Sequence, residues 1–68
     1  MKDWNHDLVH ALSEKNDALW RYRNHYKGAS KDCSSCSLLW TSLEQDDEKH
    51  VNMLADEIKR HIAENRFD

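Results

Sequence analysis

The near absence of helix-breaking residues is the feature that most constrains the fold of this chain. Proline does not occur in its 68 residues, and glycine occurs once, at position 28. Charged residues make up 34% of the chain and hydrophobic residues 38%. This composition favours helices with charged outer faces and argues against a sheet connected by many turns. We therefore expect one small all-α domain over residues 1–68, marginally stable unless something else supports it.

A first helix is predicted at about residues 3–27. Its apolar and aromatic side chains recur at the spacing of one helical face. They are Trp4, Leu8, Ala11, Leu12, Leu19, Tyr22 and Tyr26. Basic side chains fill the last turn, in the segment RYRNHYKG, and Gly28 follows them. Because glycine readily adopts the left-handed conformation that ends many helices, we expect the helix to stop there.

A serine-rich connection is predicted at residues 28–36, followed by a second helix at about 37–64. The connection contains Asp32, Ser34 and Ser35, whose side chains can cap a helix. One face of the second helix mixes apolar and polar residues: Leu39, Leu43, Asp47, His50, Leu54, Ile58 and His61. A short connection between two long helices gives an antiparallel two-helix hairpin.

A hairpin of two helices cannot cover both of its apolar faces. The chain also carries three tryptophans and two tyrosines, a large aromatic content for its length. Self-association solves both problems, because two hairpins related by a two-fold axis complete a four-helix bundle. We therefore expect a homodimer or a larger even-numbered oligomer.

Asp47 and His50 are polar residues on the apolar face of the second helix. They are three residues apart, so they lie side by side, and flanking leucines turn them toward the core. A buried carboxylate is costly unless it is paired or bound to a metal. Iron, manganese and zinc accept a carboxylate oxygen and an imidazole nitrogen together. The alternative is a pair at the edge of an interface, solvated or bound to Lys15 or Arg23.

The residues around this pair resemble a known family. The segment LWTSLEQDDEKHVNMLADEI is similar to the metal-binding helix of rubrerythrins and other ferritin-like proteins, where an acidic run ends in E-x-x-H. The segment LSEKNDALWRY resembles the preceding helix of that family, in which a ligand glutamate is followed by an aromatic residue. The spacing of Glu14 and Trp20 is similar to that in the encapsulated ferritins.

The resemblance implies a fold, a cofactor and an activity. Encapsulated ferritins are single hairpins that dimerise to assemble their iron site, so a ferritin-like bundle is expected. The resemblance implies two irons, with Glu14, Asp47 and His50 as metal ligands. The implied activity is ferroxidase-like, meaning iron oxidation or the handling of oxygen or peroxide. It leaves open whether a shell protein encloses the bundle and which redox partner serves it.

Cys33 and Cys36 form a C-x-x-C motif in the segment DCSSC, where both sulfurs can meet one metal or each other. They fall at the predicted start of the second helix, where free N–H groups stabilise a thiolate. One pair supplies two of the four ligands of a structural zinc, so a zinc clasp needs two chains. A redox switch, a disulfide or two thiols that fix the turn are alternatives. The second function hypothesis is therefore a non-catalytic helical interaction module with a zinc clasp or a thiol redox switch.

Charge and hydropathy disfavour other functions. A net charge of −3 gives no basic surface for nucleic acid. No apolar run approaches the roughly 18 residues of a membrane span. The first residues, MKDWNHDLVH, are too polar for a signal peptide, so we expect a cytoplasmic protein. A single glycine leaves no phosphate-binding loop, and no nucleophile and base are arranged for hydrolysis.

Overall fold

The computed structural model describes residues 1–68 and is helical throughout. The first helical segment consists of α1 (Asp3–Arg21), the π-helix η1 (Tyr22–Tyr26) and the short α2 (Lys27–Ala29). The second is the long helix α3 (Ser34–Ala63). No strand is present, so the predicted all-α class is confirmed.

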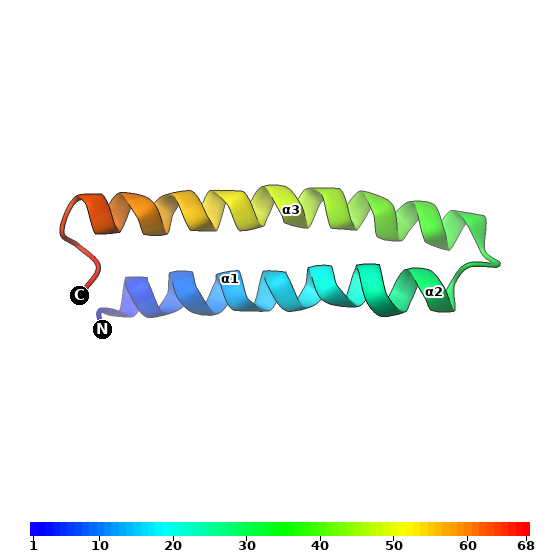
Figure 1. The fold of residues 1–68 in the computed structure, drawn as a ribbon, viewed down its shortest axis with the longest axis horizontal. Helices are drawn as coiled ribbons and strands as arrows, with labels where there is room; N and C mark the ends of the chain where they lie inside the picture. Colours follow the sequence, from blue (N-terminus) through cyan, green and yellow to red (C-terminus); the bar gives the residue numbers. More distant parts are fainter.

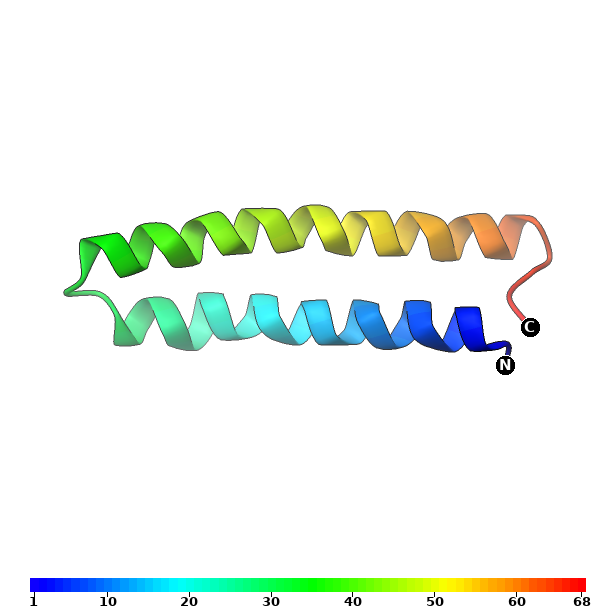
Figure 2. The same cartoon turned by 180° about the vertical axis from the view of Figure 1, so that it is seen from behind.

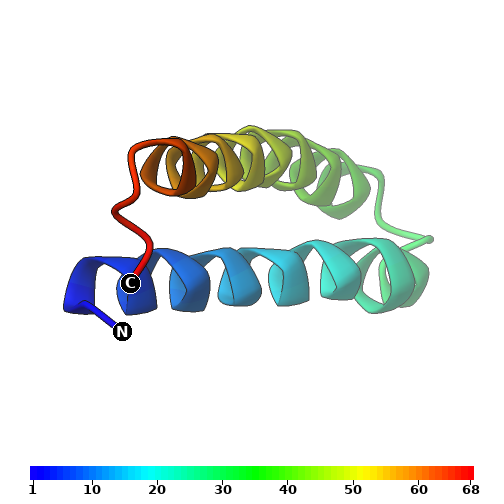
Figure 3. The same ribbon diagram turned by 60° about the vertical axis from the view of Figure 1, so that its left-hand side comes forward.

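The two helical segments lie side by side and run in opposite directions (Figure 1). The view from behind and the turned view show the same two-helix arrangement (Figure 2, Figure 3). The molecule is a rod with extents of 49 × 16 × 13 Å. Both termini lie at one end of this rod, and the connection between α2 and α3 lies at the other (Figure 1).

The prediction that the first helix stops at Gly28 is wrong. Gly28 lies inside α2, and no glycine has a positive φ. The helix ends at Ser30, where φ is −109° and ψ is 17°. The Ser30 N–H still donates to the Tyr26 and Lys27 carbonyls. Glycine adopts right-handed helical angles as well as left-handed ones, so its position alone does not mark a helix end.

The connection is shorter than the predicted range 28–36, because α3 starts earlier than expected. Cys33, with extended backbone angles, is the N-cap residue of α3, and its sulfur accepts a hydrogen bond from the Cys36 N–H. Asp32, Ser34 and Ser35 were the expected caps. Ser34 and Ser35 instead lie within the first turn of the helix.

The π-helical turn η1 widens the first segment just before the connection. The Lys27 N–H donates to the Tyr22 carbonyl, five residues earlier, which is the π-type bond. The rings of Tyr22 and Tyr26 both pack against Trp40 of α3, at centroid distances of 5.9 and 4.9 Å. Trp40 Nε1 donates to Ser30 Oγ at 3.2 Å. This aromatic cluster fastens the connection end of the rod.

The core of the single chain is very small. Leu19, 6% exposed, is the only apolar side chain that is buried. The other buried residues are polar: Asn5, Asp47 and His61. Eight large apolar side chains are exposed: Met1, Trp4, Val9, Trp20, Leu38, Leu39, Met53 and Ile62.

The shape of the chain also shows that much of its surface is left uncovered. Its accessible surface is 5066 Å², whereas a compact monomer of 8.1 kDa is expected to expose about 4,500 Å². Its radius of gyration is 15.1 Å, against about 11 Å for a compact domain of this length. The rod therefore leaves uncovered surface that a globular fold of this size would bury.

The end of the rod that carries both termini is held by a buried polar contact. Asn5, fully buried, lies opposite His61, and its Oδ1 is 2.7 Å from His61 Nδ1. Asn5 Nδ2 donates to the Arg66 carbonyl at 2.8 Å. Asn65 takes a positive φ of 56°, which turns the last residues back toward α1. The Lys2 N–H then donates to the Asp68 carbonyl at 2.7 Å, so the tail is tied to the start of α1.

Candidate functional site

Asp47 is the buried carboxylate at the middle of the rod. It lies on the side of α3 that faces α1 and is 7% exposed. Lys15 Nζ donates to its Oδ1 at 2.9 Å, and Tyr22 donates its hydroxyl proton to Oδ2 at 3.2 Å. His50 Nδ1 is 3.0 Å from Oδ1. Three donors from two helical segments therefore converge on one carboxylate.

Asp47 and Lys15 form an ion pair. Burial by itself raises the pKa of the Asp47 carboxyl, but the hydrogen bonds from Lys15, His50 and Tyr22 outweigh it and hold that pKa below its usual range. The hydrogen bond to Asp47 raises the pKa of the Lys15 ammonium. Burial, and then the hydrogen bond to Asp47, raise the pKa of the Tyr22 hydroxyl. The Asp47 carboxylate is thus ionised at neutral pH, and the Lys15 ammonium balances its negative charge.

His50 is held in a defined orientation by the same carboxylate. An ionised carboxylate only accepts hydrogen bonds, so the His50 nitrogen that contacts Asp47, Nδ1, is the one that carries the proton. The side chain of His50 is 48% exposed. In the neutral ring, Nε2 then keeps its lone pair for another partner. A carboxylate that fixes the tautomer of a histidine in this way is common behind metal-binding imidazoles.

Glu14 lies on the solvent side of α1. Its carboxylate is 3.1 Å from His10 Nε2, and its side chain is 71% exposed. It nevertheless borders the cleft, of about 430 Å³, into which Asp47 opens. The cleft is lined by Glu14, Lys15, Asp17, Ala18, Arg21, Tyr22 and Asp47. Lys15 and His50 line an adjoining cleft, so Glu14, Asp47 and His50 border two neighbouring hollows of one face.

The donors of one chain do not fit a metal ion. No group of three or more His, Cys, Asp or Glu side chains is close enough together to hold one. Asp47 Oδ1 is already bonded to the Lys15 ammonium, a cation that competes for the same lone pairs. A metal site at Asp47 with three or more protein ligands would therefore need donors from a second chain.

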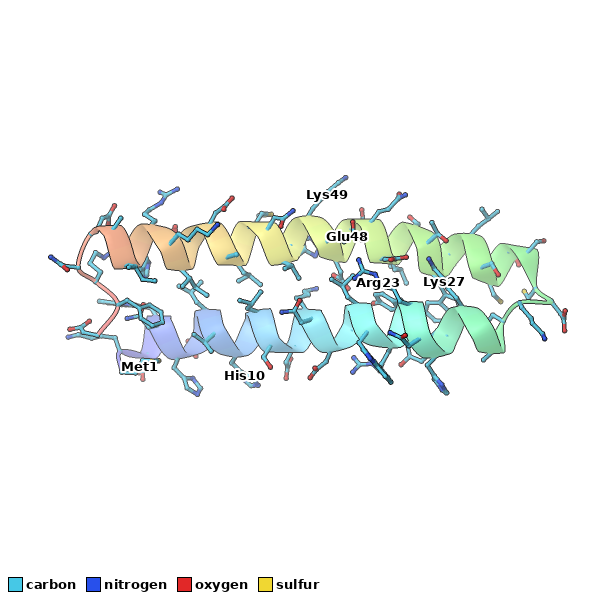
Figure 4. The ribbon with its side chains drawn as sticks, viewed as in Figure 1. Met1, His10, Arg23, Lys27, Glu48 and Lys49 are labelled. Atoms are coloured by element: carbon cyan, nitrogen blue, oxygen red, sulfur yellow. The ribbon has the colours of Figure 1, made fainter.

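Lys15 is the partner of Asp47, and Arg23, the other cation that the sequence offered, has different partners. Arg23 bonds to Glu44 through Nε at 2.5 Å and to Glu48 through Nη2. Lys27 bonds to the other oxygen of Glu44. The sticks of Figure 4 show Arg23 and Lys27 reaching from the first segment toward α3, where Glu48 is labelled. Hydrogen bonds from Lys27 and then Arg23 lower the pKa of Glu44.

Cys33 and Cys36 are free thiols, both partly buried. Their sulfurs are 2.8 Å apart, in a hydrogen bond between the two thiols. Cys33 Sγ also accepts from the Cys36 backbone N–H at 3.3 Å and lies 3.4 Å from Ser35 Oγ. These hydrogen bonds, from the Cys36 thiol first and then from Ser35, lower the pKa of the Cys33 thiol to about 7. The same contact with Cys33 raises the pKa of Cys36.

The buried pair of Asn5 and His61 was not predicted as a pair. Asn5 precedes Leu8 by three residues and Leu12 by seven, so it shares the apolar face of α1. The rule that identified Asp47, a polar residue at apolar spacing, would also have identified Asn5.

Comparison with known proteins does not assign a function to this chain. No family model, no curated protein and no solved structure matches it. None of its helices combines the length and the apolar character needed to cross a bilayer. Function must therefore be inferred from the geometry of the chain itself.

Proposed function

We propose that this chain is a helical interaction module that binds a second copy of itself and completes a four-helix bundle. The observation that carries the proposal is the burial of a single apolar side chain, Leu19, in a chain of 68 residues. A core of that size cannot offset the conformational entropy of ordering the chain. A second copy packed on one side of the rod would bury further apolar surface there, including the exposed side chains of Trp4 and Met53.

The surface that fits this role is one broad side of the rod, here called the cleft face. Three adjoining clefts open on it and share Ala11, Lys15, Leu54 and Glu57 between them. Its apolar members include Trp4, Leu8, Ala11, Ala18, Met53 and Leu54. Trp4 is 51% exposed and Met53 is 66% exposed, so apolar surface is available there.

The dimensions of the rod suit such an interface. A side of 49 by 16 Å offers about 800 Å², which is the area that each partner contributes to a standard protein–protein interface. Charges of both signs border the apolar members, with Lys15 and Glu57 lining the same cleft. Two copies related by a two-fold axis could therefore place unlike charges opposite each other along the rim.

The test is the mass of the purified chain in solution, by analytical ultracentrifugation over a range of concentrations. Wild-type chain is expected to be a dimer or a larger even-numbered oligomer. Met53→Glu places a charge in the apolar part of the cleft face and is expected to give monomer of reduced helicity. Leu38→Glu is the matched control, because Leu38 is 72% exposed and lines none of the clefts. A helical, monomeric wild type at micromolar concentration would refute the proposal.

Metal binding at the interface is a second candidate. Glu14 and Asp47 border one cleft of the cleft face, and His50, with Nδ1 bonded to Asp47, borders the next. The likeness to rubrerythrins and encapsulated ferritins adds support for iron, with zinc as the alternative metal. The chemistry taken from that likeness is iron oxidation or the handling of oxygen or peroxide. One chain brings no three His, Cys, Asp or Glu side chains together, so in this candidate a second copy completes the metal site.

Native mass spectrometry after loading with Fe(II), Mn(II) or Zn(II) tests this candidate. It predicts about one metal per chain in an even-numbered oligomer. Asp47→Asn should lose the metal, whereas the double variant Cys33→Ser, Cys36→Ser should keep it. An oligomer that takes up no metal would eliminate the candidate while leaving the interaction module intact.

A further inference from the structure

The two thiols are separate from the surface on which copies are proposed to pack. Neither Cys33 nor Cys36 lines a cleft of the cleft face. They lie at the connection end of the rod, remote from both termini (Figure 1). Self-association and the chemistry of the thiols can therefore be tested independently.

The two sulfurs touch, and their roles in the contact differ. Cys33 Sγ and Cys36 Sγ are 2.8 Å apart, and Cys33 Sγ also accepts a hydrogen bond from the Cys36 backbone N–H at 3.3 Å. Cys33 thus has a backbone N–H donor that would stabilise its thiolate, whereas Cys36 Sγ has none. A disulfide requires the two sulfurs to approach to about 2.05 Å, so closure asks for a shift of less than about 1 Å.

The surroundings of Cys33 favour negative charge on its sulfur. It occupies the N-cap position of α3, a helix of 30 residues, and its sulfur accepts a hydrogen bond from the Cys36 N–H in the first turn. No acidic residue lies in the first turn of α3 to oppose that charge. Its hydrogen bonds lower the pKa of the Cys33 thiol to about 7, so a larger share of it is ionised at neutral pH than of an ordinary thiol. An ordinary thiol, with a pKa near 8.5, is only a few per cent ionised there.

We propose that Cys33 and Cys36 form a reversible dithiol–disulfide couple that exchanges with small-molecule disulfides, with Cys33 as the attacking thiolate and Cys36 as the resolving thiol. In the first step the Cys33 thiolate attacks one sulfur of a disulfide R–S–S–R. The Cys33–S–S–R bond forms, the R–S–S–R bond breaks and one RS⁻ leaves.

In the second step Cys36 loses its proton and attacks Cys33 Sγ. The Cys33–Cys36 bond forms, and the second RS⁻ leaves. Two electrons have passed from the two cysteines to the small-molecule disulfide, and the two thiol protons end on two RSH. The reverse sequence, started by an excess of RSH, returns both cysteines to thiols.

A metal site is less well supported at this position. The pair has no third Cys, His, Asp or Glu close enough to complete a metal-binding group. Redox exchange, by contrast, needs only the two sulfurs already in contact.

The experiment equilibrates the full chain with mixtures of reduced and oxidised glutathione, followed by alkylation and intact-mass analysis. Wild type should convert between two free thiols and one internal disulfide, with little mixed disulfide. Cys36→Ser should accumulate the mixed disulfide with glutathione, because nothing resolves it. Cys33→Ser should react far more slowly at pH 7. Serine is itself a good N-cap, so this variant keeps the start of α3.

A pH profile of alkylation gives a second, independent readout. The wild-type rate should rise with a midpoint near pH 7, the pKa of Cys33. In Cys33→Ser the midpoint should lie at about 8.5 or above, as for ordinary thiols. The proposal is overturned if both cysteines stay reduced in excess oxidised glutathione, or if the two single variants react alike. It is also overturned if the purified chain carries zinc that protects both cysteines from alkylation.

Discussion

Replacing Asn5 by alanine tests how the two helices and the tail are held together at the end of the rod that carries both termini. Asn5 is fully buried and connects three parts of the chain. Its side chain bonds to His61 of α3 at 2.7 Å and to the Arg66 carbonyl of the tail at 2.8 Å. Alanine removes the amide and keeps the helix, since alanine is the best helix former. The effect therefore reports the polar contact and not the helix itself.

The expected cost follows from the groups left without partners. Asn5 Oδ1 accepts the proton of His61 Nδ1, and His61 is 4% exposed, so its N–H would lose a partner inside the protein. A buried unsatisfied donor costs about 1–3 kcal/mol. The Arg66 carbonyl loses a donor as well, but the tail can open to water and recover part of that loss. A total of about 2–4 kcal/mol is expected, a large share of the few kcal/mol available to so small a domain.

Thermal unfolding followed by circular dichroism at one fixed concentration measures this cost. A loss of about 2–4 kcal/mol corresponds to a fall in Tm of roughly 10–25 °C for a chain of this length. Concentration must be matched because self-association would raise Tm. Asn52→Ala is the control, since Asn52 is exposed on α3 and should change stability by no more than about 0.5 kcal/mol. Equal Tm values for the two variants would show that the tail and His61 do not depend on Asn5.

Gly28→Ala should stabilise the chain by up to about 1 kcal/mol in urea unfolding, because Gly28 is helical and an added Cβ meets nothing within 4 Å; destabilisation would mean that Gly28 lies outside a helix. Acid should unfold the chain: the pKa values of Asp47 and Glu44 are lower folded than unfolded, so their contribution to stability is present above about pH 4 and is lost as pH falls through the folded-state values. The double variant Asp47→Asn, Glu44→Gln should show a flatter dependence of Tm on pH, and an unchanged dependence would contradict this. Lys15→Met removes the main hydrogen bond that opposes burial at Asp47, so the pKa of Asp47 measured by NMR titration should rise; no change would exclude the ion pair.

The helices and their inner faces could be predicted from the sequence because both follow from a local period. Leu19 and Asp47 lie where the helical spacing places them, and both are buried. The spacing fixes how each helix is rotated but not how far one helix is shifted along the other. The sequence therefore left both Lys15 and Arg23 as partners for Asp47. The register of the two helices places Lys15 beside Asp47 and places Arg23 beside Glu44 and Glu48.

The features that could not be predicted depend on contacts between distant parts of the chain. The rings of Tyr22 and Tyr26, the first and last residues of the π-turn, pack on Trp40 of α3. Because Trp40 is distant in the sequence, the residues of the turn alone do not reveal this contact. Gly28 has right-handed helical backbone angles and lies inside α2. The sequence alone does not show which of its allowed conformations a glycine adopts. Glu14 was predicted from the family resemblance to be a ligand beside Asp47. The structure puts it on the edge of the same cleft, with its carboxylate 3.1 Å from His10 Nε2.

The position of the thiols at one tip of a 49 Å rod has a consequence for any assembly of this chain. Two copies packed side by side and antiparallel would carry one dithiol at each end of the dimer. Such a dimer would be bivalent and could bridge two disulfide-bearing partners about 50 Å apart. Two copies packed side by side and parallel would instead bring all four sulfurs to the same end of the dimer. The direction in which the copies pair would thus decide between a molecular spacer with two reactive ends and a single four-thiol centre.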